Sequence, residues 1–345
     1  MHVTRDTDPR KARLTVETRA NSLLNGQPQF TLMEVADRLE VEPRTIRRMW
    51  TAMGFPGIED EENDQIFTGY DIEMMRRHLD KLSAGQLDAN TLNSLVLAQG
   101  HMADRLVLWQ HEALVEFAES TFEIDDIAAR YWVIDHVDDY LSLLEDQMRY
   151  VWRRHMAAFL RRSDLELRRR GPDLDTPDIM PLQRAVGFID LVAFTSKSRE
   201  LGSAQLVTFI RDFEFTCREI ITQNGARLVK TVGDAVIFIA DDLTIGAKVA
   251  TELVYQLGKI EGMLPVKASL LWGRVVSSFG DIFGPTVNLA SRLVDIADEG
   301  SILIDRATYT ALGDAGRGSY MVLPYGQQDL GGTGTVEIFE LKKFR

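Results

Sequence analysis

The amino-acid sequence predicts an α+β protein with an all-α first half and a strand-rich second half. Apolar residues recur at helical spacing over residues 30–160, whereas strands and helices alternate in the second half. The 345 residues suffice for two domains of ordinary size. We place a helical domain at residues 1–170, a linker at 171–182 and a second domain at 183–345.

Composition excludes several classes of protein. No apolar run approaches the roughly 18 residues that span a bilayer, and the first residues lack the apolar stretch of a secretory signal. The single cysteine, Cys217, cannot form an intrachain disulfide. The net charge of −13 gives no general attraction to nucleic acid. We therefore expect a cytoplasmic protein without a membrane span.

The first half contains clear helix signals. Thr31 stands three residues before Glu34, which is the pattern of a capping box at a helix start. The helical period continues over residues 92–117 and 124–160. After these, residues 161–181 are rich in charge and then in Gly and Pro, which end helices and mark the domain boundary.

The second half predicts strands and helices in the order of a ferredoxin-like βαββαβ core, with further elements at its end. A Gly-Asp pair between two apolar runs marks the hairpin of this core. The expected elements are a strand at 184–194, a helix at 204–223, a hairpin at 226–240, a helix at 243–257, a strand at 266–272, a helix at 286–297 and a strand at 301–305.

Two carboxylates stand at the ends of apolar strands. Asp190 follows a run of apolar residues, and Asp234 lies at the tip of the predicted hairpin. In this fold the two strands are neighbours, so both carboxylates converge at one edge of the sheet. Such a pair suits a hard cation that keeps waters and binds substrate phosphates. The alternative interpretation is that both are ordinary turn residues.

Other polar residues accompany this pair. Lys230 precedes Asp234 by four residues, and Asn288 and Arg292 lie one helical turn apart. An Asn and an Arg in this arrangement can orient a sugar oxygen and stabilise charge on a phosphoryl group. Alone, each is an ordinary surface residue, but their combination and order favour a phosphate-handling site.

Three segments, FIDLVAFTSKS, LVKTVGDAVIF and FGDIFGPTVNLASRL, resemble the signature motifs of class III nucleotidyl cyclases. The resemblance covers residues 183–345. It implies a class III catalytic domain that forms a head-to-tail homodimer with its sites at the interface. It also implies that Asp190 and Asp234 hold two Mg²⁺ or Mn²⁺ ions and that the substrate is ATP.

The resemblance assigns further roles. Lys230 and Asp281 select the adenine base across the dimer interface, Asn288 positions the ribose, and Arg292 stabilises the reacting phosphorus. The expected product is 3′,5′-cyclic AMP, with pyrophosphate leaving. Guanine has a carbonyl where adenine has the amine that would donate to Asp281. The Asp281 carboxylate would then lack a donor, so the alternative of a guanylate cyclase is disfavoured.

Two positions depart from the family pattern. Lys267 and Ser269 stand where the family commonly has Arg and Gly. Lys267 keeps the positive charge and is our candidate for contact with the substrate phosphates. However, it lacks the two-pronged geometry of a guanidinium, so weaker binding is expected.

Residues 30–82 resemble the winged helix-turn-helix of mercury-resistance-type regulators. Arg44, Arg47 and Arg48 would lie on the recognition helix. The loop that would grip the phosphates is acidic over residues 59–64, and such a loop repels a duplex. We therefore do not expect DNA binding. The alternative is an ATP-sensing transcription regulator with a non-catalytic cyclase-like domain.

The whole layout resembles soluble actinobacterial holoenzyme cyclases with an N-terminal autoregulatory domain, some of which respond to pH. All six histidines lie in the first half. We hypothesise that protonation of His111, His136 or His155 regulates the enzyme, although six ordinary helical histidines are an equally good interpretation. The many methionines of this half leave a lipid effector as another interpretation.

Overall fold

The computed structural model describes residues 9–170, 182–278, 280–315, 319–331 and 334–344. The chain divides into two compact units, Met1–Thr176 and Pro177–Arg345. Apart from residue 182, the predicted linker lies outside the described residues.

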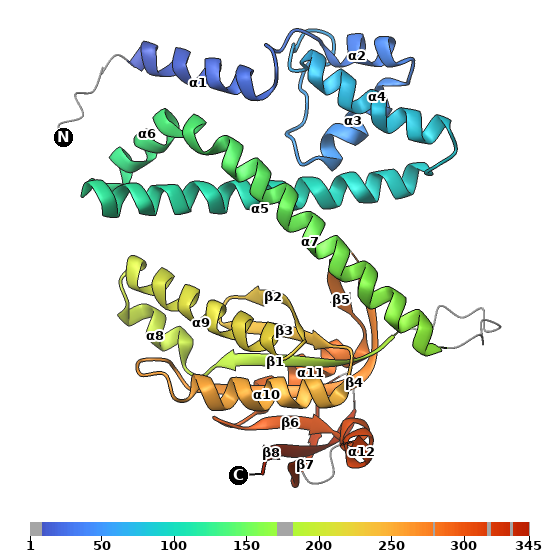
Figure 1. Cartoon of the computed structure of the whole chain (residues 1–345), viewed down its shortest axis with the longest axis vertical. Coiled ribbons are helices and arrows are strands. Elements are labelled where there is room, and N and C mark those ends of the chain that lie inside the picture. Colours follow the sequence, from blue (N-terminus) through green and yellow to red (C-terminus); the bar gives the residue numbers. More distant parts are fainter. Residues whose placement is uncertain (1–8, 171–181, 279, 316–318, 332–333, 345) are drawn as a thin grey trace. The chain divides into compact units, whose positions relative to one another are not determined.

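The first unit consists of helices (Figure 1). None of the described helices is long and apolar enough to cross a membrane. The helices are α1 (Pro9–Leu23), α2 (Leu32–Leu39), α3 (Pro43–Ala52), α4 (Gly69–Ser83), α5 (Ala89–Phe122), α6 (Asp126–His136) and α7 (Asp138–Arg170).

The helices α2, α3 and α4 enclose a small core. The predicted capping box is present, because Thr31 and Glu34 each accept a hydrogen bond from the other's backbone N–H. Ile46 and Phe67 are fully buried at the centre of this core. A bridge between Phe30 and Phe67 joins the start of α2 to the start of α4. The winged-helix character of residues 30–82 stays a prediction.

The helical period over residues 124–160 is divided between two helices. The helix α6 ends at His136 and α7 begins at Asp138. Two acidic residues in the first turn of α7 favour a helix start there, since they complement the dipole at a helix N-terminus. Our expectation of one continuous period did not foresee this break.

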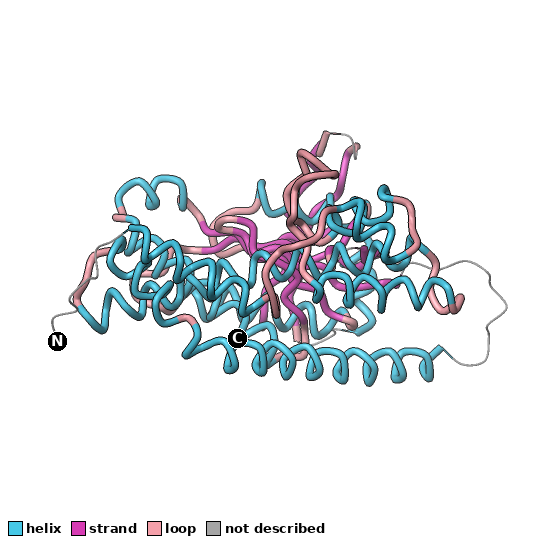
Figure 2. The backbone as a smooth tube through the Cα atoms, turned by 90° about the horizontal axis from the view of Figure 1, so that it is seen from above, coloured by secondary structure: helices cyan, strands magenta, loops and turns pink. Residues whose placement is uncertain are grey.

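The second unit contains one mixed sheet, and in Figure 2 all the strands, drawn in magenta, belong to this unit. The strands are β1 (Leu182–Leu191), β2 (Arg227–Val232), β3 (Ala235–Ala240), β4 (Val266–Ser278), β5 (Asp281–Phe283), β6 (Ile302–Asp305), β7 (Tyr320–Asp329) and β8 (Thr335–Lys343). The helices are α8 (Phe194–Glu200), α9 (Ser203–Gln223), α10 (Leu243–Leu257), α11 (Pro285–Ile296) and α12 (Arg306–Ala315).

The strand order of this sheet is β2-β3-β1-β4-β6-β8-β7, with β5 paired to β4 outside this path. The pairing of β4 with β6 is parallel, and the other pairings are antiparallel. The prediction of an α+β fold with a βαββαβ core is confirmed, and β5 to β8 extend it.

Helices cover both faces of this sheet. One core includes Phe213 of α9 and Leu253 of α10, and the other includes Leu293 of α11. The strand β1 lies inside the sheet, between β3 and β4, and Gly187 allows the Phe238 ring of β3 to lie across it, because a Cβ there would come within 2.1 Å of that ring. A residue at the end of β1 is therefore held by strands on both sides.

Candidate active site

Asp190 lies at the end of β1, an interior strand of the sheet. Its register partners are Ala235 on β3 and Lys267 on β4. The strand before it is buried, since Val186 and Ile189 have no exposed surface, while the Asp190 side chain is 21% exposed. The apolar strand thus delivers one carboxylate to the rim of the sheet.

Asp234 lies in the turn between β2 and β3. Gly233 makes this turn possible, because its φ of 61° is in the left-handed region that favours glycine. The N–H of Leu191 donates to the Asp234 carbonyl oxygen at 3.3 Å, which joins the hairpin tip to the end of β1. The structure therefore brings together the two carboxylates that the sequence analysis paired.

Burial and charge act on Asp190. Partial burial raises the pKa of its carboxyl group, and the nearby carboxylate of Asp234 raises it further. Lys267 opposes this with its Nζ 3.4 Å from Oδ2 of Asp190, but the net pKa is still raised. A positive charge bound here would relieve the repulsion between the two carboxylates.

The donor set fits a hard divalent cation. Among the described residues, no group of three or more His, Cys, Asp or Glu is placed to hold a metal ion. The chain thus offers two carboxylates, and the other ligand positions would fall to water and substrate oxygens. Mg²⁺ is commonly bound in this way, through one or two carboxylates and phosphates.

Lys230 and Asp281 form a second polar group. Nζ of Lys230 donates to Oδ2 of Asp281 at 2.5 Å, which links β2 to β5 across 51 residues of sequence. Burial acts to raise the pKa of Asp281, but hydrogen bonds from Lys230 and from the Ile282 N–H lower it overall. Asp281 is therefore a carboxylate acceptor next to a cationic donor.

The helix α11 carries the third group. Gly284 is its N-cap and Pro285 its first residue, and the helix packs against β4 and β1. Asn288 is exposed and lies one turn before Arg292. Nη1 of Arg292 donates to the Leu330 carbonyl oxygen at 2.9 Å, at the end of β7. No sequence signal could have found this contact, because its acceptor is a backbone atom 38 residues away.

The side chain of Lys267 is bonded to other residues of its own chain. Its Nζ lies between Oδ2 of Asp190 and the carbonyl oxygen of Asp295, to which it donates at 3.1 Å. Lys267 is thus held within the site by its own chain. Its proposed contact with phosphate stays a prediction.

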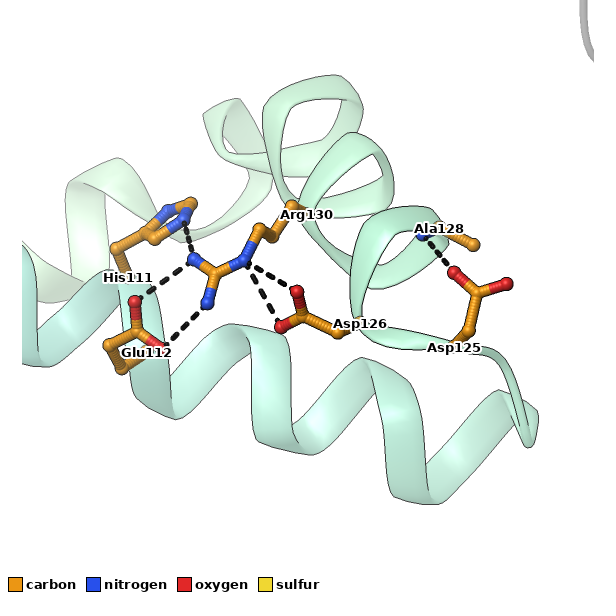
Figure 3. A network of polar contacts seen from close by, with 6 residues as sticks. All are labelled: His111, Glu112, Asp125, Asp126, Ala128 and Arg130. Atoms are coloured by element: carbon orange, nitrogen blue, oxygen red, sulfur yellow. Dashed lines mark hydrogen bonds and ion pairs between the residues drawn. The ribbon is translucent and has the colours of Figure 1, made fainter. Parts of the chain in front are cut away.

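The three candidate regulatory histidines do not form one cluster. Nε2 of His111 lies 3.5 Å from Nη1 of Arg130, and Arg130 also pairs with Glu112 and Asp126 (Figure 3). This network joins α5 to α6. The other two lie elsewhere: His136 stacks on Trp132 of its own helix at 4.4 Å between ring centres, and His155 is exposed on α7.

The acidic loop after α3 acts on the arginines of that helix. Arg47 forms a two-point ion pair with Glu61 of the loop, and Arg44 pairs with Glu42. Arg47 is thus neutralised within the chain. The expectation that the segment does not bind DNA stays a prediction.

Comparisons with known proteins show which family the chain belongs to. No protein-family model matches the chain. An adenylate cyclase of Glutamicibacter nicotianae is 36% identical over 312 residues, which are 88% of this chain and 77% of that protein. An adenylate cyclase of Streptomyces coelicolor is 31% identical over 287 residues, 83% of this chain and 72% of that protein.

Solved structures are similar to about half of the chain. The catalytic core of a rhodopsin-guanylyl cyclase with converted specificity, in complex with ATPαS, covers 49% of this chain and 100% of its own, at 20% identity and a TM-score of 0.45. The two relatives above are each more than 30% identical over most of their length. Because of these two relatives, the chain belongs to the adenylate cyclase family.

Proposed function

We propose that this protein converts ATP to 3′,5′-cyclic AMP and pyrophosphate. The observation that carries the proposal is the meeting of Asp190 and Asp234 at one edge of the sheet, supported by the Leu191–Asp234 backbone hydrogen bond. Relatives named adenylate cyclase cover most of the chain and support the same activity.

Asp190 and Asp234 would hold Mg²⁺ or Mn²⁺, two ions per site. When bound, such ions lower the pKa of a ribose hydroxyl and neutralise phosphate charge. The chain's own part is to hold two carboxylates close together in spite of their repulsion, with Lys267 as a partial counterion.

The remaining residues bind and orient the nucleotide. Asp281 accepts a hydrogen bond from the exocyclic amine of adenine, and Lys230 donates to a ring nitrogen. Asn288 holds the ribose so that its 3′-oxygen lies in line with the α-phosphorus. That oxygen gives its proton to solvent water and bonds to the α-phosphorus, while the bond from that phosphorus to the bridging oxygen breaks and pyrophosphate leaves. Arg292 stabilises the charge that develops on the phosphoryl oxygens.

We further propose a homodimer through the catalytic domains. The ribbon of β4 and β5 supports this, because Val276 and Phe283 are register partners with 53% and 48% of their surfaces exposed. Large apolar side chains grouped on an exposed ribbon are typical of an interface. The Lys230–Asp281 pair borders the same ribbon, so a second copy bound there would lie next to the adenine-binding residues.

The first unit is proposed to regulate this activity through protons. A proton on His111 would place a second cation 3.5 Å from Nη1 of Arg130. Glu112 and Asp126 face the same guanidinium and would offset part of this repulsion. Acid is therefore expected to loosen the contact between α5 and α6. Among the residues that the structure describes, no contact indicates a site for a lipid effector.

The test is cyclic nucleotide formation by the purified full chain, with ATP or GTP and with Mg²⁺ or Mn²⁺. We expect turnover of ATP that is lost in Asp234→Ala. Glu219→Ala, which removes an exposed carboxylate from α9, is the matched control and should keep full activity. Preference for GTP would establish the guanylate cyclase instead. ATP binding without turnover under any condition would favour the nucleotide-sensing regulator.

A further inference from the structure

The two residues that depart from the family pattern both bond to the same helix. Lys267 and Ser269 are two residues apart on β4, so their side chains point to the same face of the sheet. Nζ of Lys267 donates to the carbonyl oxygen of Asp295, and Oγ of Ser269 donates to that of Ala290 at 2.6 Å. Both acceptors belong to α11, Ala290 in its middle and Asp295 in its last turn.

The bond made by Ser269 is fully enclosed. Ser269 and Ala290 have no exposed surface, so the hydroxyl has no water to bond. A buried hydroxyl without a partner is costly, and the Ala290 carbonyl supplies that partner. Ala290 lies two residues after Asn288 and two residues before Arg292. The bond therefore holds α11 to β4 at a point midway between Asn288 and Arg292.

The strand that makes this bond is also fixed to the carboxylate end of the site. Ser269 is the register partner of Phe188 on β1, and Lys267 is the partner of Asp190. The other hydrogen bonds from the sheet to α11 reach its last two residues, where Lys267 donates to Asp295 and Tyr325 of β7 donates to Ile296. Around Ala290 the described contacts of α11 with the sheet are apolar ones, such as those of Leu293 and Val294. Apolar contacts are non-directional and resist a small slide of the helix poorly, whereas a short hydrogen bond resists it well.

We propose that Ser269 is a positioning residue that sets the place of Asn288 and Arg292 relative to Asp190. The glycine common in the family has no hydroxyl and could not make this bond. The proposal rests on the proposed function, since it concerns the geometry of that site.

The first test is the steady-state kinetics of Ser269→Ala in the full chain. Because Arg292 acts on the transition state, we expect kcat to fall about tenfold while KM for ATP changes about twofold or less. The matched control is Thr308→Val. Thr308 is fully buried and accepts a hydrogen bond from the Trp272 N–H at 2.8 Å, and so links β4 to α12, which carries no candidate site residue. It should lower the melting temperature and leave kcat unchanged.

A double-mutant cycle separates positioning from general stability. If Ser269 acts through Arg292, then Ser269→Ala should lower kcat about twofold or less when Arg292 is already Lys. An equal fold-loss in both backgrounds would overturn the proposal. So would an unchanged kcat in Ser269→Ala, or a loss of kcat in Thr308→Val as large as that in Ser269→Ala.

Hydrogen exchange gives a readout that needs no turnover. Amides of residues 286–296 should exchange faster in Ser269→Ala than in either the wild type or Thr308→Val. If the wild type makes no cyclic AMP, the proposed function fails, but this measurement still tests the bond. Unchanged exchange in α11 would overturn the positioning role even in an active enzyme.

Discussion

The two units of the chain bury their apolar side chains in different ways. In the second unit, helices cover both faces of the sheet, and Phe213 and Phe238 are fully enclosed. In the first unit, the long helices α5 and α7 leave large side chains in solvent, with Trp109 61% and Trp152 60% exposed.

Geometry explains this difference. A sheet offers two broad faces, and a few short helices can cover them. The helix α7 has 33 residues and is roughly 50 Å long at about 1.5 Å per residue, so the 11-residue helix α6 that packs against it cannot cover it. The second unit is therefore stabilised by the apolar side chains that it buries. Much of the apolar surface of the first unit is exposed and does not contribute to a core within that unit.

The largest expected effect lies in the second unit. Asp190→Asn should lower kcat by about a thousandfold or more, since it removes one of the two carboxylates that we propose as metal ligands. The same change should raise the melting temperature at neutral pH. A carboxyl whose pKa is raised on folding costs stability where it is ionised, and the amide has no charge to bury.

Cyclic AMP assays and thermal melting of the full chain check both parts. A melting temperature below that of the wild type at pH 7 would contradict the second part. It would mean that the ion pair with Lys267 outweighs burial and the repulsion from Asp234.

Substitutions of aromatic residues test the difference in burial between the two units directly. Phe238→Ala should lower the free energy of unfolding of the second unit by about 3–5 kcal/mol, because it empties a packed site. Trp152→Ala should change the stability of the first unit by about 0.5 kcal/mol or less, because most of its side chain is exposed. Urea unfolding followed by circular dichroism measures both. A large loss in Trp152→Ala would show that something covers α7 in solution.

The single cysteine allows the second unit to be followed alone. Cys217 is fully buried in α9, and burial raises the pKa of its thiol to about 12. A thiol reagent at pH 8 should therefore leave the native protein unmodified and label it only when the second unit opens. Phe238→Ala should raise the labelling rate and Trp152→Ala should not. Rapid labelling of the native wild type would contradict the enclosed core.

The smallest effect is expected in the first unit. His111→Gln should leave the maximal rate within about twofold and flatten the acid side of the pH profile, because glutamine cannot gain a proton next to Arg130. The matched control is His155→Gln on the exposed surface of α7, which should keep the wild-type profile. Identical profiles for all three proteins would remove His111 from the regulation.

Local sequence patterns predicted much of this molecule. The capping box at Thr31, the Gly233 turn and the apolar strand before Asp190 depend on neighbouring residues, and each could be located without tertiary information. The same patterns led us to expect one period over residues 124–160, where the structure has a break at Val137. No Pro or Gly marks that break, so periodicity alone could not show it.

What the sequence determined by itself was the order of the elements and the identity of the candidate site residues, because turn chemistry, strand period and motif spacing are local. Only the tertiary structure decided what those residues touch. Lys230 meets Asp281 from 51 residues away, Arg292 reaches the Leu330 carbonyl, and Ser269 grips α11 through a backbone oxygen. Such contacts depend on how strands and helices pack together. Every residue has a backbone carbonyl, so the residue type does not show which carbonyl accepts a hydrogen bond.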